Sequence, residues 1–160
     1  MSRLVIDWPD GGAERVRAAR GRLELAGHAL SSLPIEERIR RVVAALVRYM
    51  GSNPDYPRLL LQQIVASPLP HPVVQSAVRE NLLMLQRLVE EGQADGSIRE
   101  GDPLLMALSL ISQPAHMSVV LRPVRHIMEI PEEAEAFLDR LSTHAADFAV
   151  RALEAREESP

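Results

Sequence analysis

The chain has 160 residues, which is the length of one domain, since domains usually span about 100–200 residues. Hydrophobic residues make up 46% and charged residues 25% of the chain, so a disordered or collagen-like protein is excluded. Cysteine is absent, which excludes a disulfide framework and a cysteine nucleophile. Aromatic residues reach only 3%, and because strands favour aromatic and β-branched side chains, the composition favours helices.

The charge pattern does not indicate a nucleic-acid-binding surface over the whole molecule. All 18 cationic residues are arginine, but they are dispersed among 22 acidic residues and the net charge is −4. Arginine could serve phosphate recognition, because its guanidinium binds in a bidentate manner, or could reflect genome base composition. Arg15, Arg17, Arg20 and Arg22 are either a phosphate-contacting patch or a solvated helix face.

Prolines and glycines divide the chain into helical segments. Residues 1–12 are expected to form an irregular lead-in, residues 13–156 a single helical domain, and residues 157–160 a frayed tail. The first helix is expected over residues 13–31. The next begins near Ser32, with Pro34 in its first turn, and ends at Gly51. A shorter helix follows from Asn53 to Val65 and is stopped by three prolines between residues 68 and 72.

The second half of the chain continues this pattern. A long amphipathic helix is expected from Val73 to about Gly92, followed by a polar connector. Asp102 is expected to cap the next helix, Leu104 to Leu121, which is apolar nearly all round and therefore expected to be central and buried. The last helix is expected from Pro131 to about Glu154. Together these segments predict an all-α antiparallel bundle of about six helices.

Neither a membrane segment nor an enzyme motif is recognised. The longest strongly apolar stretch, residues 104–111, is too short to span a bilayer, so we expect a cytoplasmic protein with no membrane partner. Nucleophile-elbow, phosphate-loop and dinucleotide-binding motifs are missing. A helical di-iron centre needs paired Glu-x-x-His motifs, whereas His126 precedes Glu129 in the reverse order. We therefore expect no catalytic residue, no metal and no cofactor.

Polar residues on the apolar helix suggest a small-molecule pocket. Ser109, Gln113 and His116 share one helical face, and Pro114 cannot donate to the carbonyl of Leu110, so it is expected to kink the helix. Alternatively, Ser109 bonds its own backbone and His116 is a core or interface histidine. Methionines and one asparagine on neighbouring helices extend the candidate pocket. The candidate ligand-binding residues are Met50, Asn81, Met84, Ser109, Gln113, His116 and Met117.

The last helix mixes alanine with leucine and phenylalanine along one stripe, which permits the close approach of another helix. An isologous homodimer is the commonest soluble assembly, so this helix is a candidate dimer surface. Alternatively, it packs only on its own core. The candidate dimer-interface residues are Leu121, Leu138, Leu141, Ala145, Phe148 and Ala152.

Residues 88–116, LVEEGQADGSIREGDPLLMALSLISQPAH, resemble the C-terminal domain of TetR-type transcriptional regulators. In that family a long helix typically ends in an EEG-x-x-x-G-x-[IF]-R connector, and an Asp-Pro-like start leads into a buried helix. The helix start at residues 53–60 and the final helix from residue 131 to 154 are similar too. The resemblance covers about residues 34–155.

The resemblance implies a sensor domain of a repressor. It implies that a small, largely apolar effector binds within the helical bundle, and that the last two helices form a homodimer interface. Effector binding would then weaken operator binding by a helix-turn-helix. Residues 1–30 do not contain that motif, so DNA contact is expected only through a segment outside this chain. The alternative is a stand-alone helical dimerisation protein that binds neither ligand nor DNA.

Overall fold

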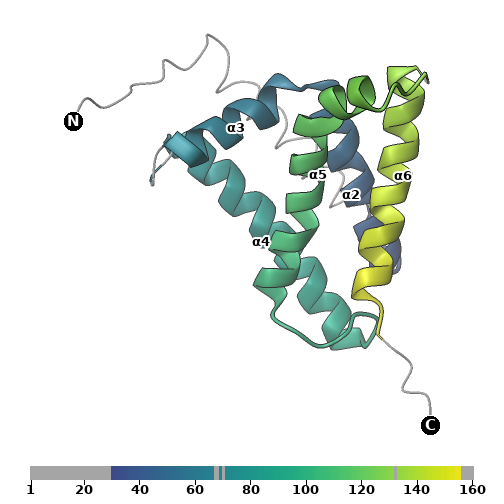
Figure 1. Cartoon of the computed structure of the whole chain (residues 1–160). Helices are drawn as coiled ribbons and strands as arrows, with labels where there is room; N and C mark the ends of the chain where they lie inside the picture. The colour runs from purple at the N-terminus through teal and green to yellow at the C-terminus, as the bar shows by residue number, and fades with distance from the viewer. Residues whose placement is uncertain (1–29, 67–68, 70, 132, 156–160) are drawn as a thin grey trace.

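The computed structural model describes residues 30–155 except residues 67, 68, 70 and 132. This part of the chain forms a bundle of five helices, and its only β-type pairing is an isolated bridge (Figure 1). The all-α prediction is confirmed. The additional helix expected over residues 13–31 lies almost entirely outside the described residues. The helices are α2 (Ile35–Ser52), α3 (Asp55–Ala66), α4 (Pro72–Asp95), α5 (Pro103–Ile127) and α6 (Ala134–Leu153).

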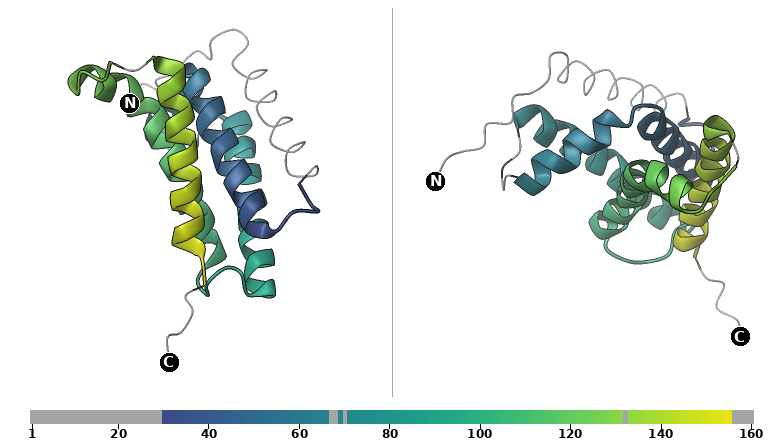
Figure 2. Two further views of the ribbon diagram at one scale, coloured as in Figure 1. Left: turned by 90° about the vertical axis from the view of Figure 1, so that its right-hand side faces the viewer. Right: turned by 45° about the horizontal axis from the view of Figure 1, so that its top comes forward.

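Helix α2 is the centre of the core. Its buried positions recur with the helical period from Ile35 to Met50, and Leu46 in their middle has no exposed surface. Helix α6 runs antiparallel along one side of α2, whereas α4 and α5 pack together on another side (Figure 2). The residue that precedes α2 is Pro34 rather than the expected Ser32, and no side chain caps this helix.

Helix α6 lies against α2 through small side chains. Ser142, Ala145, Ala146 and Ala149 are buried on this side, and their small size lets the two helices approach closely. Ion pairs flank the contact, because Arg40 of α2 pairs with Asp147 and Arg48 pairs with Asp139. Alanine therefore marks the side of α6 that the protomer buries against itself.

Two positions at the connector between α4 and α5 require glycine. Gly96 ends α4 in the left-handed conformation, with a φ of 81°, which a glycine adopts without strain. Ile98 then folds back over Gly92, so a Cβ atom at Gly92 would lie only 2.5 Å from Cδ1 of Ile98. The N–H of Arg99 donates to the carbonyl of Leu153 over 2.9 Å and joins the connector to the end of α6.

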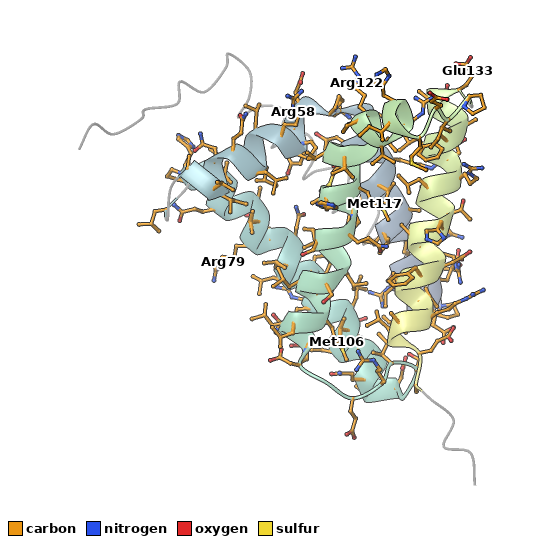
Figure 3. All side chains as sticks on the ribbon, in the orientation of Figure 1. Arg58, Arg79, Met106, Met117, Arg122 and Glu133 are labelled. Atoms are coloured by element: carbon orange, nitrogen blue, oxygen red, sulfur yellow. The ribbon has the colours of Figure 1, made fainter. Side chains whose placement is uncertain are left out.

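Helix α5 begins as expected but is longer and more exposed. Asp102 caps it, because its carboxylate accepts from the N–H groups of Leu104 and Leu105 at 2.9 and 3.2 Å. The helix continues past Leu121 to Ile127, and it turns over near Arg122, next to a second proline, Pro123 (Figure 3).

The expectation that α5 is buried all round is wrong. Leu105 is 60% exposed and Leu108 is 46% exposed, although Met106, Ala107 and Leu110 face the core. An apolar surface shows that contact with water is unfavourable, but it does not identify the neighbour that covers it. By length and composition this 25-residue helix could also span a bilayer. The apolar stretch of residues 104–111, on which the sequence prediction was based, covers only part of it. Its inner side nevertheless packs along α2 and α4.

Candidate functional site

Two apolar stripes lie exposed on neighbouring sides of α5 and α6. The stripe on α6 recurs every three or four residues and consists of Phe137, Leu141, His144, Phe148 and Ala152. Phe148 is 56% exposed, and its ring lies 6.4 Å from that of His144. Leu105, Leu108 and His116 lie on the exposed side of α5. The two helices contact each other much less than each contacts α2, so a hollow remains between them.

This hollow is a groove of about 370 Å³. Ligand pockets generally occupy about 300–1,000 Å³, so the groove has room for a small molecule. Its lining is mainly apolar and comes from the first turns of α5, the last turns of α6 and the connector before α5. The lining residues are Arg99, Gly101, Asp102, Leu105, Met106, Ser109, Leu110, Gln113, Phe148, Ala149, Ala152 and Leu153.

Two of the candidate ligand-binding residues, Ser109 and Gln113, line the groove. The hydroxyl of Ser109 donates to the carbonyl of Leu105 over 2.9 Å, as the alternative interpretation expected, and its oxygen remains able to accept. Gln113 is half-buried, and its amide can both donate and accept. His116 is exposed and does not line the groove, so it is not a core histidine.

The other candidate ligand-binding residues lie elsewhere. Met50 is 2% exposed and belongs to the core, while Met84 and Met117 are half-buried and pack against it. Figure 3 shows Met117 about halfway along α5, well above Met106, which lines the groove. Asn81 is half-buried on α4. The structure therefore places Ser109 and Gln113 in the groove, leaves His116 exposed outside it, and puts the other four candidates in or against the bundle.

The candidate dimer residues also divide. Phe148 and Ala152 line the groove, and half-buried Leu141 belongs to the same stripe. Ala145 has no exposed surface, and Leu138 packs against Gly51 of α2. Ala145 is therefore enclosed within the protomer, which corrects its assignment to the interface, whereas Leu138 is half-buried and packs against the core. Leu121 is half-buried near the end of α5.

The sequence interpretation did not select Arg99, which lies at one end of the groove. Its Nε–H donates to the carbonyl of Ala152 over 3.0 Å, and Nη1 donates to the carbonyl of Glu100 over 3.4 Å. Arg99 makes no ion pair with any described residue, unlike Arg40 and Arg48 on α2. The only signal in the sequence was its place at the end of the EEG-x-x-x-G-x-I-R connector.

One buried titratable group lies outside the groove. Tyr56 of α3 is 8% exposed, and its ring meets that of Tyr49 edge-on, with 5.5 Å between centroids. Burial, followed by the proximity of Tyr49, raises the pKa of Tyr56 to about 12. This pair fastens α3 to α2 and does not reach the groove. Within the described residues, no group of three or more His, Asp or Glu side chains could hold a metal ion.

Comparison with solved structures shows the same fold in three bacterial proteins. A regulatory protein of the TetR family from Rhodococcus RHA1 is 15% identical, with a TM-score of 0.68 over 91% of this chain and 74% of that one. A protein of unknown function from Rhodococcus sp. RHA1 is 19% identical, with a TM-score of 0.71 over 90% and 70% of the two chains. A TetR/AcrR-family transcriptional regulator from Thermobifida fusca YX-ER1 is 19% identical, with a TM-score of 0.65 over 85% and 69%.

The family of this chain follows from a match between its sequence and the model of a known domain family. No protein with a curated description matches the chain. The model of the tetracyclin repressor-like C-terminal domain, however, matches residues 32–119, which is more than half of the chain and includes α2, α3, α4, the connector and most of α5. This chain therefore belongs to the TetR family, through a tetracyclin repressor-like C-terminal domain.

Proposed function

We propose that this protein is the dimerising, effector-sensing part of a transcriptional repressor, and that it has no catalytic activity. The observation that carries the proposal is the group of exposed apolar side chains on neighbouring sides of α5 and α6. Large apolar side chains, among them Leu105 and Phe148, are more than half exposed there. A contiguous apolar surface on a protein usually marks an interaction site.

A second copy of the chain is the partner that suits this face. Helices α5 and α6 run antiparallel beside each other, so a two-fold axis through the face would make a four-helix contact from two identical pairs. We propose that Leu105, Leu108, Phe148 and Ala152 contribute to this contact, together with Leu141 and Leu121 at its edge. Covering the face would also bury the apolar side of α5 without a membrane.

The effector is proposed to bind in the groove between the same two helices. Ser109 and Gln113 supply hydrogen-bonding groups there on an otherwise apolar wall. Suppose that a ligand has a higher affinity for one arrangement of α5 and α6 than for another. Its binding would then shift the dimer toward the arrangement with the higher affinity. This would couple effector binding to the separation of two DNA-binding helix-turn-helix segments, which lie outside the described residues.

Analytical ultracentrifugation tests the dimer. We expect the wild-type chain to sediment as a dimer at micromolar concentration and Phe148→Glu to sediment as a folded monomer, because the variant would bury an unpaired charge in the interface. The matched control is Val65→Glu on α3, where an apolar side chain is 85% exposed but lies far from this face. A monomeric wild type, or equal sedimentation of the wild type and Phe148→Glu, would refute the dimer.

A thermal-shift screen of small molecules tests sensing. A ligand at 100 times its dissociation constant stabilises the folded state by about 2.7 kcal/mol, which raises the melting temperature by several degrees. The shift should be smaller in Gln113→Ala and unchanged in the control Gln62→Ala, which changes an exposed glutamine on α3. If a broad library gives no shift while the dimer persists, the chain is instead a dimerisation protein without an effector.

A further inference from the structure

The groove has a cationic end and an apolar body. Two backbone carbonyls hold the guanidinium of Arg99 in place at one end, and its second terminal nitrogen has no partner among the residues that the structure describes. A cation without an ion pair can bind an anionic group of a ligand through charge-assisted hydrogen bonds. Arg99 itself is exposed, so a ligand can reach it without any rearrangement of the core.

The rest of the groove offers little to a polar ligand. Met106, Leu110 and Leu153 are buried beneath it, while Leu105 and Phe148 are exposed on its two walls. Ser109 and Gln113 are the polar side chains on the wall that α5 provides. A hydrocarbon segment placed there would be removed from water, which favours binding by about 25 cal/mol for each Å² of apolar surface buried.

The charge balance restricts the anionic group. Asp102 also lines the groove, although its Oδ1 already accepts two N–H groups of α5. Arg99 is the one cation and Asp102 the one carboxylate among the lining residues, so a phosphate monoester or a dicarboxylate would add two negative charges to a groove that already holds one carboxylate. A single planar carboxylate matches the fork of one guanidinium.

We infer that the effector is an amphipathic monocarboxylate, such as a medium-chain fatty acid. Its carboxylate would bind Arg99, and its hydrocarbon tail would lie between Leu105 and Phe148 along the groove. This inference rests on the proposed function of the groove as the effector site, and it adds the chemical class of the ligand.

Isothermal titration calorimetry of the full chain with decanoate, below its micelle-forming concentration, tests the inference. Decanoate should bind saturably, with one molecule per chain, and decanol should bind at least tenfold more weakly. Arg99→Met keeps an unbranched apolar side chain but removes the charge, and should weaken decanoate binding about 10- to 100-fold. The matched control Arg79→Met removes one arginine that points away from the bundle on α4 and should leave binding unchanged (Figure 3).

A second variant tests the position of the tail. Ala152→Phe adds a ring to an exposed wall of the groove and should abolish binding, while circular dichroism should show an unchanged helix content. The inference is overturned if decanoate does not saturate, if Arg79→Met weakens binding as much as Arg99→Met, or if Ala152→Phe binds like the wild type. If other compounds stabilise the protein in a manner that depends on Gln113, but decanoate does not bind, the ligand class is wrong and the sensing function stands.

Discussion

The two sides of α6 differ in what covers them. The side that faces α2 carries small residues, such as Ala145 and Ala146, and is sealed within the protomer. The other side carries Phe148 and Ala152, which are exposed and line the groove. We call the first the sealed side and the second the open side. Small residues permit close helix packing, whereas large apolar side chains that gather on an exposed surface usually mark an interaction site.

The two sides of α6 show how one helix can pack within the protomer and also present a second surface for association. Since α6 must pack on α2 before it can present a face to a second copy, the sealed side should determine the stability of the protomer. The open side should determine association and ligand binding. The predictions below test this division.

The largest effect is expected from a matched pair of truncations on α6. Leu153→Ala removes a core side chain of α6 that is 5% exposed and lies beneath the groove, and should lower the free energy of unfolding by about 2–5 kcal/mol. Phe148→Ala on the open side should lower the stability of the isolated protomer by less than about 1 kcal/mol, because the ring is 56% exposed. Urea denaturation at several protein concentrations separates the stability of the protomer from the contribution of association. Equal losses of stability for both variants would contradict the proposed difference between the two sides of α6.

The contact between α3 and α2, away from both sides of α6, should respond to alkaline pH through Tyr56. Its pKa is about 12 in the folded protein against 10.0 as the ordinary value, so the folded state holds its proton more tightly. The associated stability is fully present below pH 10 and is lost as the pH rises toward 12. The loss amounts to about 2–3 kcal/mol. Urea denaturation from pH 9 to 12 should show the loss in the wild type, and Tyr56→Phe should show less of it.

The cap at the end of the groove should have a smaller effect. Asp102→Ala removes the acceptor for two N–H groups of α5 and should cost about 0.5–2 kcal/mol of stability. Asp102→Asn should recover most of this loss, since asparagine caps helices equally well. Thermal unfolding measures both, and a wild-type melting temperature for Asp102→Ala would show that the cap contributes nothing.

The smallest effect is expected at the rim of the sealed side. Arg48 and Asp139 form an ion pair in which both side chains are about half exposed, so Arg48→Met should change the free energy of unfolding by at most about 1 kcal/mol. The wild type should lose the same small contribution in high salt, and the variant should not. A loss of several kcal/mol, measured by urea denaturation, would mean that charge rather than alanine packing seals α6 to α2.

The sequence by itself determined the helices and most of their ends. Proline and aspartate act locally, through a missing N–H group and through capping, so Asp102 could be interpreted without the fold. The end of α4 was less exact, because the helix continues past the expected Gly92 to Asp95. The connector motif also sufficed to place the chain in its family. The polar stripe on α5 led to Ser109 and Gln113, two of the residues that line the groove.

The tertiary structure decided which side of each apolar helix is covered, because helical periodicity gives the spacing of a stripe but not its neighbour. This is why Ala145 and Leu138 belong to the core rather than to the open side, and why α5 is only partly buried. Arg99 became a candidate for the same reason. Its sequence position is unremarkable, and only the folding of the connector onto the end of α6 brings its charge to the groove.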